Sequence, residues 1–374
     1  MLQAGTAPFR ASGQAREAES HRPQLDALRG LAVLTVMLYH FSPTLEAHAP
    51  DLGLAGVRLF FGLSGFLITG ILLRCRDRIQ DGQSTVGFQL RRFYLRRSLR
   101  IFPAFYATLF LAAALNMDGA RPTFWWNCFY ASNFQMAWHG SWPGIMSHFW
   151  SLAVEEQFYL IWPWLVLFAP PRRLPQLIGL ACVLGPVTRA VSLMVAPDNP
   201  VAAVVLTPSC LDQLGAGALL AWLWHTRGAA AALPARWRRT GLVLLMTAVP
   251  AQILLWPEGR WSIVLAPVVQ AVAFAALIDG AGRGFGGVVG AGLNWRPLRW
   301  TGQISYGLYL LHNFSHWWGP RILRQLTNYR QAYFTNEAIH VLYLTLLSFG
   351  AATTSWYLWE RPLNRLKSRI NYTA

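Results

Sequence analysis

Apolar stretches as long as a membrane span recur through the whole sequence. Ten can be placed, at approximately 29–45, 54–73, 101–117, 148–169, 174–195, 203–225, 241–256, 261–279, 298–318 and 338–359. A helix of about 20 apolar residues crosses the hydrocarbon core of a bilayer. Only 13% of the residues are charged, whereas about 25% are charged in soluble domains. The sequence therefore predicts an all-α fold, a polytopic integral membrane helix bundle of about ten transmembrane helices.

The basic residues predict the orientation of this bundle. Most of the 32 Lys and Arg residues lie in the terminal segments and in the loops on one side of the predicted spans. Loops rich in Lys and Arg face the cytoplasm, so we expect both termini there. The net charge of +16 could point to nucleic acid, but a chain this apolar offers no basic face on a soluble fold. We therefore expect membrane lipid around the bundle and no nucleic-acid partner.

Three segments and two long loops follow from this pattern. We expect 1–24 to be a mobile cytoplasmic N-terminal segment, 25–365 the membrane domain and 366–374 a cytoplasmic tail. Loop 74–100 is predicted to be cytoplasmic and loop 118–147 external. Tryptophans in the external loop form an interfacial belt or stack on an acceptor such as a sugar. The four cysteines form no CxxC or CxxH pair, so no metal site is predicted.

The first span carries two groups that are costly inside a membrane. Arg29 and His40 are 11 residues apart in LDALRGLAVLTVMLYHF. At about 100° and 1.5 Å per residue, both side chains lie on one helix face, about 16 Å apart. An ionisable group within a span indicates a functional site, here a line along which a charged, elongated ligand could lie. The alternative is a buried histidine that bonds a neighbouring helix, with Arg29 as an interfacial anchor.

A run of arginines precedes Pro103. If the run is helical, Arg92, Arg96 and Arg100 share one face, with Arg97 beside Arg100. Guanidinium groups bind phosphate in a bidentate manner, so the run could hold a multiply phosphorylated cofactor. The alternative is a topology signal that also contacts anionic lipid.

The segment FWSLAVEEQFYLIWP places two adjacent carboxylates, Glu155 and Glu156, in an apolar span. Ser151, Glu155 and Tyr159 repeat every four residues and form one polar stripe. Because a buried carboxylate is costly, we expect this stripe to face a partner or a wet cavity. A carboxylate near His40 would fix the tautomer of the ring and raise its basicity.

Two arginines fall within predicted spans and offer a structural alternative. Arg58 or Arg189 could form an ion pair with Glu155 or Glu156, and Arg189 could equally pair with Asp212.

Two further motifs allow more than one interpretation. GLSGFLITG (62–70) contains small residues that permit close helix contact, or that open a passage for a thin ligand. SYGLYLLH in the ninth span places Tyr309 and His312 on one helix face, with Tyr306 adjacent. These three side chains could bind the acceptor substrate, or they could form hydrogen bonds between helices.

Taken together, the chain resembles the acyltransferase-3 family of polytopic membrane O-acyltransferases. The motifs that carry the resemblance occur in family order and span about residues 23–365: LDALRGLAVLTVMLYHF, FFGLSGFLITG, FYLRRSLRIFP, FWSLAVEEQFYLIWP, ISYGLYLLH and WERP. The resemblance implies functional pairs at Arg29 and His40 and at Arg97 and Arg100. It also implies a cytoplasmic acyl-CoA donor and an acceptor hydroxyl on the far side, commonly on a saccharide. Because the chain ends soon after Pro362, we expect the stand-alone form without an SGNH domain.

These observations give one functional hypothesis and its rivals. We expect a multi-pass enzyme of the bacterial plasma (inner) membrane that moves an acyl group to a saccharide hydroxyl. The acyl group is expected to be acetyl, with acetyl-CoA as its donor. The arginines would hold coenzyme A, and His40 would act as general base or be acylated first. The alternatives are a transporter or flippase of a lipid-linked glycan, or an enzyme that acylates a macrolide-like molecule. The acyl chain length and the oligomeric state are left open.

The expected site residues can be grouped by role. The catalytic residues are His40, Glu155 and Glu156; the donor-binding residues are Arg29, Arg92, Arg96, Arg97 and Arg100; the acceptor-binding residues are Ser151, Tyr159, Tyr306, Tyr309 and His312.

Overall fold

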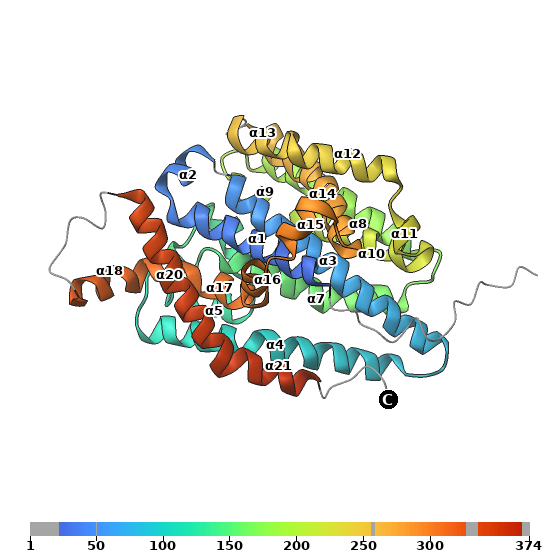
Figure 1. Ribbon diagram of the computed structural model, residues 1–374, viewed down its shortest axis with the longest axis horizontal. Coiled ribbons are helices and arrows are strands. Elements are labelled where there is room, and N and C mark those ends of the chain that lie inside the picture. Colours follow the sequence, from blue (N-terminus) through green and yellow to red (C-terminus); the bar gives the residue numbers. More distant parts are fainter. Residues whose placement is uncertain (1–21, 50, 256–258, 327–335, 369–374) are drawn as a thin grey trace, which may run out of the picture.

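The helical prediction is confirmed by a computed structural model. The structure describes residues 22–49, 51–255, 259–326 and 336–368, and within these ranges the chain forms helices and contains no β-strand. Figure 1 shows an elongated bundle whose long helices run side by side. Four of the described helices are long and apolar enough to cross a membrane, by length and composition: α3, α8, α14 and the helix that begins at Glu337.

The helices follow one another with short connections. Their bounds are α1 (Pro23–Phe41), α2 (Pro43–His48), α3 (Asp51–Gln80), α4 (Val86–Ala114), α5 (Phe124–Cys128), α6 (Ser132–His139), α7 (Phe149–Phe168), α8 (Leu174–Val195), α9 (Pro200–Val205), α10 (Leu211–Arg227), α11 (Ala229–Ala232), α12 (Ala235–Met246), α13 (Ala248–Leu255), α14 (Arg260–Arg283), α15 (Gly287–Leu293), α16 (Arg296–Gln303), α17 (Ser305–Leu311), α18 (Ser315–Leu326), α20 (Glu337–Ser355) and α21 (Arg361–Ser368). The predicted N-terminal segment lies outside the described residues up to residue 21, as does the predicted tail from residue 369.

The centre of the bundle depends on glycines that bring helix backbones together. A Cβ atom at Gly65 of α3 would lie 2.0 Å from the carbonyl oxygen of Leu214 in α10. A Cβ atom at Gly217 of α10 would lie 2.0 Å from the carbonyl oxygen of Gly62. Small residues at such crossings allow the close packing on which membrane helices depend. Of the two interpretations of GLSGFLITG, close helix contact therefore holds for these glycines.

The arginine run lies on a helix and not in a loop. The sequence predicted a long loop at 74–100, but α3 continues to Gln80 and α4 begins at Val86. Thr85 caps α4 by accepting a hydrogen bond from the Phe88 amide. Arginine is a good helix former. The arginines therefore interrupt the apolar pattern from which spans are predicted, but α4 continues through them. The C-terminal helix α21 lies beside α4 (Figure 1).

The predicted ninth span, 298–318, is not one continuous helix. The chain passes through α16 and α17, then a 3-10 turn at His312–Phe314, and then α18. Hydropathy detected the apolar character of this stretch, but it carries no information on where the helix breaks. Interrupted helices within membranes are found where the freed backbone groups meet protein partners or line a cavity.

Candidate active site

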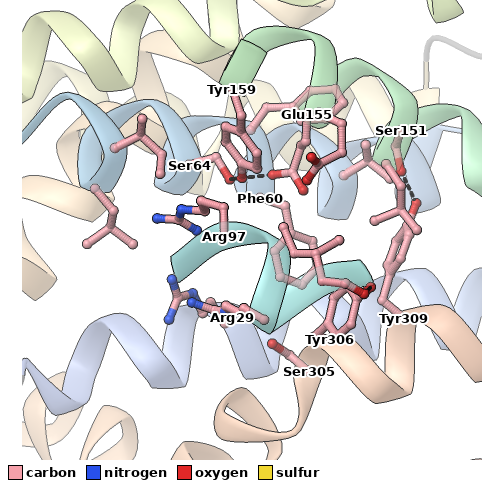
Figure 2. Close-up of a pocket in the computed structure, with 18 residues that line it drawn as sticks. Arg29, Phe60, Ser64, Arg97, Ser151, Glu155, Tyr159, Ser305, Tyr306 and Tyr309 are labelled. Atoms are coloured by element: carbon pink, nitrogen blue, oxygen red, sulfur yellow. Dashed lines mark hydrogen bonds between the residues drawn. The ribbon is translucent and has the colours of Figure 1, made fainter. Parts of the chain in front are cut away.

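A polar pocket lies inside the bundle, where α1, α3, α4, α7 and α17 meet (Figure 2). Its empty volume is about 800 Å³, including open space at its mouth. Its polar lining consists of Arg29, Ser64, Arg97, Arg100, Ser151, Glu155, Glu156, Tyr159, Ser305, Tyr306 and Tyr309. This group contains most of the site residues that the sequence predicted. We call it the central pocket.

Three arginines form the cationic part of the central pocket. Arg29 comes from α1, and its Nη1 lies 3.5 Å from Asp26 Oδ1. Arg97 and Arg100 come from α4, and the Arg97 guanidinium carbon lies 5.2 Å from the centre of the Tyr159 ring. Figure 2 shows Arg29 and Arg97 pointing into the same space.

Two of the predicted donor-binding residues lie elsewhere. Arg92 and Arg96 are not part of the lining. The guanidinium carbon of Arg92 lies 4.8 Å from the ring centre of Phe88, on its own helix. Arg92 and Arg96 therefore share a helix with the pocket arginines but not the pocket itself.

The carboxylates face these arginines from α7. Ser64 of α3 donates a hydrogen bond to Glu155, and its Oγ lies 3.0 Å from the Tyr159 hydroxyl. Oε1 of the neighbouring Glu156 is buried without a hydrogen-bond partner among the described residues. The pocket therefore presents carboxylate and hydroxyl oxygens opposite guanidinium groups. Such an arrangement can orient a ligand that carries both anionic and hydrogen-bonding parts.

The two arginines considered as ion-pair partners for these carboxylates have other partners. Arg58 Nη1 lies 2.7 Å from Asp51 Oδ1. Arg189 Nη2 lies 2.6 Å from Asp212 Oδ2, so the prediction of an Arg189–Asp212 pair is confirmed. Glu155 and Glu156 therefore form no ion pair with Arg58 or Arg189, and both line the central pocket.

Ser151 and Tyr309 line one end of the central pocket. Their hydroxyl groups are hydrogen-bonded to each other, as Figure 2 shows. Ser151 Oγ and the Tyr309 hydroxyl oxygen also lie 3.1 and 3.2 Å from the backbone oxygen of His148, to which the hydroxyl that does not donate within the pair can donate. The same two residues therefore border the pocket on one side and a group of histidines on the other.

The histidine cluster consists of His40, His148, His312 and His316. His40 Nδ1 lies 2.9 Å from His312 Nε2, and the rings of His148 and His312 have centroids 4.9 Å apart. His316 Nε2 donates to the His40 carbonyl oxygen at 3.1 Å. Among the described residues, no group of three or more His, Cys, Asp or Glu side chains is arranged to hold a metal ion.

The structure separates the two groups that the sequence placed on one line. Arg29 lines the central pocket, whereas His40 lies beyond it, in the histidine cluster. Both do belong to α1, as the helical spacing predicted. The hydrogen-bond partner of the His40 ring is His312 and not the carboxylate that the sequence suggested. Helical spacing predicts that Arg29 and His40 lie on one face of α1. Which groups contact that face depends on how the segment of α17 and His312 packs against it.

Sequence reasoning missed part of this arrangement. In the sequence, Ser64 is one of the small residues of GLSGFLITG, although its hydroxyl donates a hydrogen bond to Glu155. No sequence motif described above predicts a role for His148 or His316. The signal for His148 was its position immediately before FWSLAVEEQ, one turn ahead of Ser151.

The described helices form a membrane helix bundle, and its internal pocket gathers arginines, carboxylates and hydroxyls that can bind a polar ligand. The sequence profile of acyltransferase family 3, described as an acyltransferase domain, matches residues 22–360. The chain therefore belongs to the acyltransferase-3 family.

Several named bacterial proteins are similar to this chain. The peptidoglycan O-acetyltransferase OatA of Listeria monocytogenes is 29% identical over 331 residues, which is 79% of this chain and 50% of that protein. The Bacillus subtilis protein YrhL is 29% identical over 326 residues, 79% of this chain and 49% of that protein. The O-acetyltransferase OatA of Staphylococcus aureus is 30% identical over 226 residues, 54% of this chain and 34% of that protein. The chain thus spans about half or less of these relatives. No solved structure matches it significantly.

Proposed function

We propose that this protein is a bacterial plasma-membrane O-acetyltransferase that moves an acetyl group from cytoplasmic acetyl-CoA to a hydroxyl of an extracytoplasmic saccharide. The observation that carries the proposal is the central pocket, in which three arginines face two glutamates. Family membership supports acyl transfer. The names of the Listeria and Staphylococcus relatives support acetyl as the group, and that of the Listeria relative supports a glycan acceptor.

Arg29, Arg97 and Arg100 bind the phosphates of coenzyme A in this proposal. Coenzyme A carries several phosphate groups, and arginine recognises phosphate through paired N–H donors. The three guanidinium groups line one pocket, so they can bind phosphate groups of the same donor molecule. Arg92 and Arg96, which lie outside the lining, have at most an electrostatic role.

The acyl arm reaches the histidine cluster past Ser151 and Tyr309. His40 then removes the proton of the acceptor hydroxyl. The acceptor oxygen attacks the thioester carbonyl, the carbon–sulfur bond breaks, and the proton passes to the sulfur to give free coenzyme A. Glu155 and Glu156 orient the donor, while Tyr159 and Tyr306 contribute hydroxyl groups to the same pocket.

The experiment uses the purified protein in liposomes. A soluble peptidoglycan fragment is enclosed in the lumen, and acetyl-labelled acetyl-CoA is added outside. The expected result is labelled fragment inside the liposomes and one free coenzyme A outside for each acetyl group transferred. Liposomes without protein and liposomes that enclose an acceptor with methylated hydroxyls are the controls.

Two results contradict the proposal. If acetyl-CoA is neither bound nor consumed while a lipid-linked glycan crosses the bilayer, the protein is a flippase. If acetyl transfer occurs equally to the methylated acceptor, the acceptor group is not a hydroxyl.

A further inference from the structure

A chain of three hydrogen-bonding groups fixes the proton positions in the histidine cluster. His312 Nδ1 lies 2.7 Å from the carbonyl oxygen of Tyr309, and His312 Nε2 lies 2.9 Å from His40 Nδ1. A carbonyl oxygen can only accept a hydrogen bond. His312 must therefore carry a proton on Nδ1.

The surroundings of His312 require its ring to be neutral. Its side chain is fully buried, and the neighbouring ring of Phe41 has its centroid 6.1 Å away. In the part of the chain that the structure describes, no carboxylate forms an ion pair with His40 or His312. A buried charge without a partner is costly. With one proton, on Nδ1, His312 presents a bare Nε2 that can only accept.

This acceptor sets the tautomer of His40. Because His312 Nε2 accepts, His40 Nδ1 must donate, and the neutral His40 ring then has no proton on Nε2. That atom has no hydrogen-bond partner among the described residues, and the His40 side chain is half-buried, whereas His312 is enclosed. His40 Nε2 is thus a bare nitrogen, on a residue that is less buried than His312.

We propose that His312 is a positioning residue that holds His40 in the tautomer whose Nε2 is the base. The inference rests on the proposed function, since it assumes that His40 takes the acceptor proton. When Nε2 gains that proton, His40 Nδ1 continues to donate to His312 Nε2, and the lone pair there stabilises the imidazolium. In serine hydrolases, a carboxylate fixes the tautomer of the catalytic histidine and stabilises its imidazolium form. Here the neutral ring of His312 has that function.

The same geometry removes the other buried histidines from consideration as the base. Both nitrogens of His312 are occupied. His148 Nε2 donates to the Leu310 carbonyl oxygen at 3.1 Å, and its Nδ1 lies 3.4 Å from Asn313 Nδ2, an amide donor. The sequence expectation that His312 binds the acceptor substrate stays a prediction. His312 does not line the central pocket, and in the present proposal it positions His40.

The first test reads the tautomer directly. Protein with ¹⁵N-labelled histidine is placed in bilayers, and the His40 resonances are assigned as those lost in His40→Gln. The expected spectrum has a protonated Nδ1 and a bare Nε2 for His40 in the wild type. A proton on Nε2 with a bare Nδ1 overturns the proposal. This measurement requires no activity, so it stands apart from any failure of the proposed acetyl transfer.

The second test compares two replacements of His312. In His312→Gln, the amide oxygen can still accept from His40 Nδ1, whereas His312→Leu has similar bulk and no acceptor. We expect His312→Leu to lower acetyl transfer by about 10- to 100-fold, by analogy with the loss found when a hydrogen-bond partner of a metal-bound histidine is removed, with unchanged coenzyme A affinity. His312→Gln should recover most of that loss. His48→Leu, the same change at an exposed histidine of α2, is the matched control.

Two results test the positioning role: the recovery of acetyl transfer in His312→Gln, and the His40 spectrum in His312→Leu. In His312→Leu, His40 should show a mixture of tautomers, and in His312→Gln it should keep a protonated Nδ1. Equal transfer rates in the two variants, or an unchanged His40 spectrum in His312→Leu, would contradict a positioning role.

Discussion

At the scale of single residues, two ionisable groups of α1, Arg29 and His40, lie in different parts of the site. Arg29 lines the central pocket, and His40 bonds His312 in the histidine cluster. Binding of the donor and chemistry on the acceptor should therefore respond to different substitutions on one helix.

Replacing each of these two residues should separate the two functions. His40→Ala should lower acetyl transfer by about 100- to 10,000-fold, the usual contribution of a positioned general base, with coenzyme A affinity nearly unchanged. Arg29→Ala should weaken coenzyme A binding first. The measurement is coenzyme A affinity and transfer rate on both variants side by side. Near-normal acetyl transfer by His40→Ala would show that His40 is not the general base, and Glu155 or Glu156 would be the next candidate.

A second residue pair concerns stability and not chemistry. The side chains of Arg189 and Asp212 are 3% and 4% exposed and bond each other at 2.6 Å. Breaking a buried ion pair costs about 3–5 kcal/mol because one charge is left without its partner. Asp212→Ala should therefore lower the thermal unfolding midpoint in detergent clearly, while Asp198→Ala, at an exposed position, should not. Replacing both partners by apolar residues should recover part of the loss, and no recovery would argue against this explanation.

At the scale of the helices, the crossing of α3 and α10 depends on the absence of side chains. Gly65→Ala would place a Cβ 2.0 Å from the Leu214 carbonyl oxygen, whereas at Gly70 on the same helix the nearest atom to a Cβ is Arg74 Nη1 at 3.7 Å. We expect Gly65→Ala to lower thermal stability and transfer together, because α3 also carries Ser64 into the pocket. Gly70→Ala should behave as the wild type. Similar stability of the two variants would mean that the helices can separate without cost.

The helix α4 offers a matched pair of double variants. Arg97 and Arg100 line the pocket, and Arg92 and Arg96 do not. Arg97→Ala with Arg100→Ala should strongly weaken acetyl-CoA binding in a titration, and lysine at both positions should rescue poorly if phosphate is held by paired donors. Arg92→Ala with Arg96→Ala removes the same charge and should bind acetyl-CoA nearly normally. Equal losses of acetyl-CoA affinity in the two double variants would mean that the arginines act only through their total charge.

At the scale of the whole molecule, the orientation in the membrane still rests on the distribution of Lys and Arg. In a variant without native cysteines, Trp138→Cys should react with an impermeant thiol reagent added outside the cell. Gln83→Cys should react only after permeabilisation. Both positions are exposed, and Gln83 is preferable to its neighbour Gly82, whose φ of +69° disfavours other residues. Labelling of both from outside would reverse the orientation.

The sequence predicted the parts of this molecule that depend on local pattern. Apolar stretches gave the helices, and helical spacing correctly gave Ser151, Glu155 and Tyr159 one lining face. It could not give contacts that depend on packing between distant segments. The bond between His40 and His312 joins residues 272 positions apart, and nothing in the spacing of either motif encodes it. For the same reason the boundary between the central pocket and the histidine cluster was not foreseen.

The break between α17 and α18 has a consequence for how the molecule can vary. The groups that hold the protons of His312 and His148 are the carbonyl oxygens of Tyr309 and Leu310, which belong to the peptide backbone. No side-chain replacement at residue 310 can delete such an acceptor. The course of the backbone, and not the side chain at residue 310, therefore fixes which nitrogens of His312 and His148 carry protons. This arrangement should be kept in any variant at residue 310 that keeps the bend between α17 and α18.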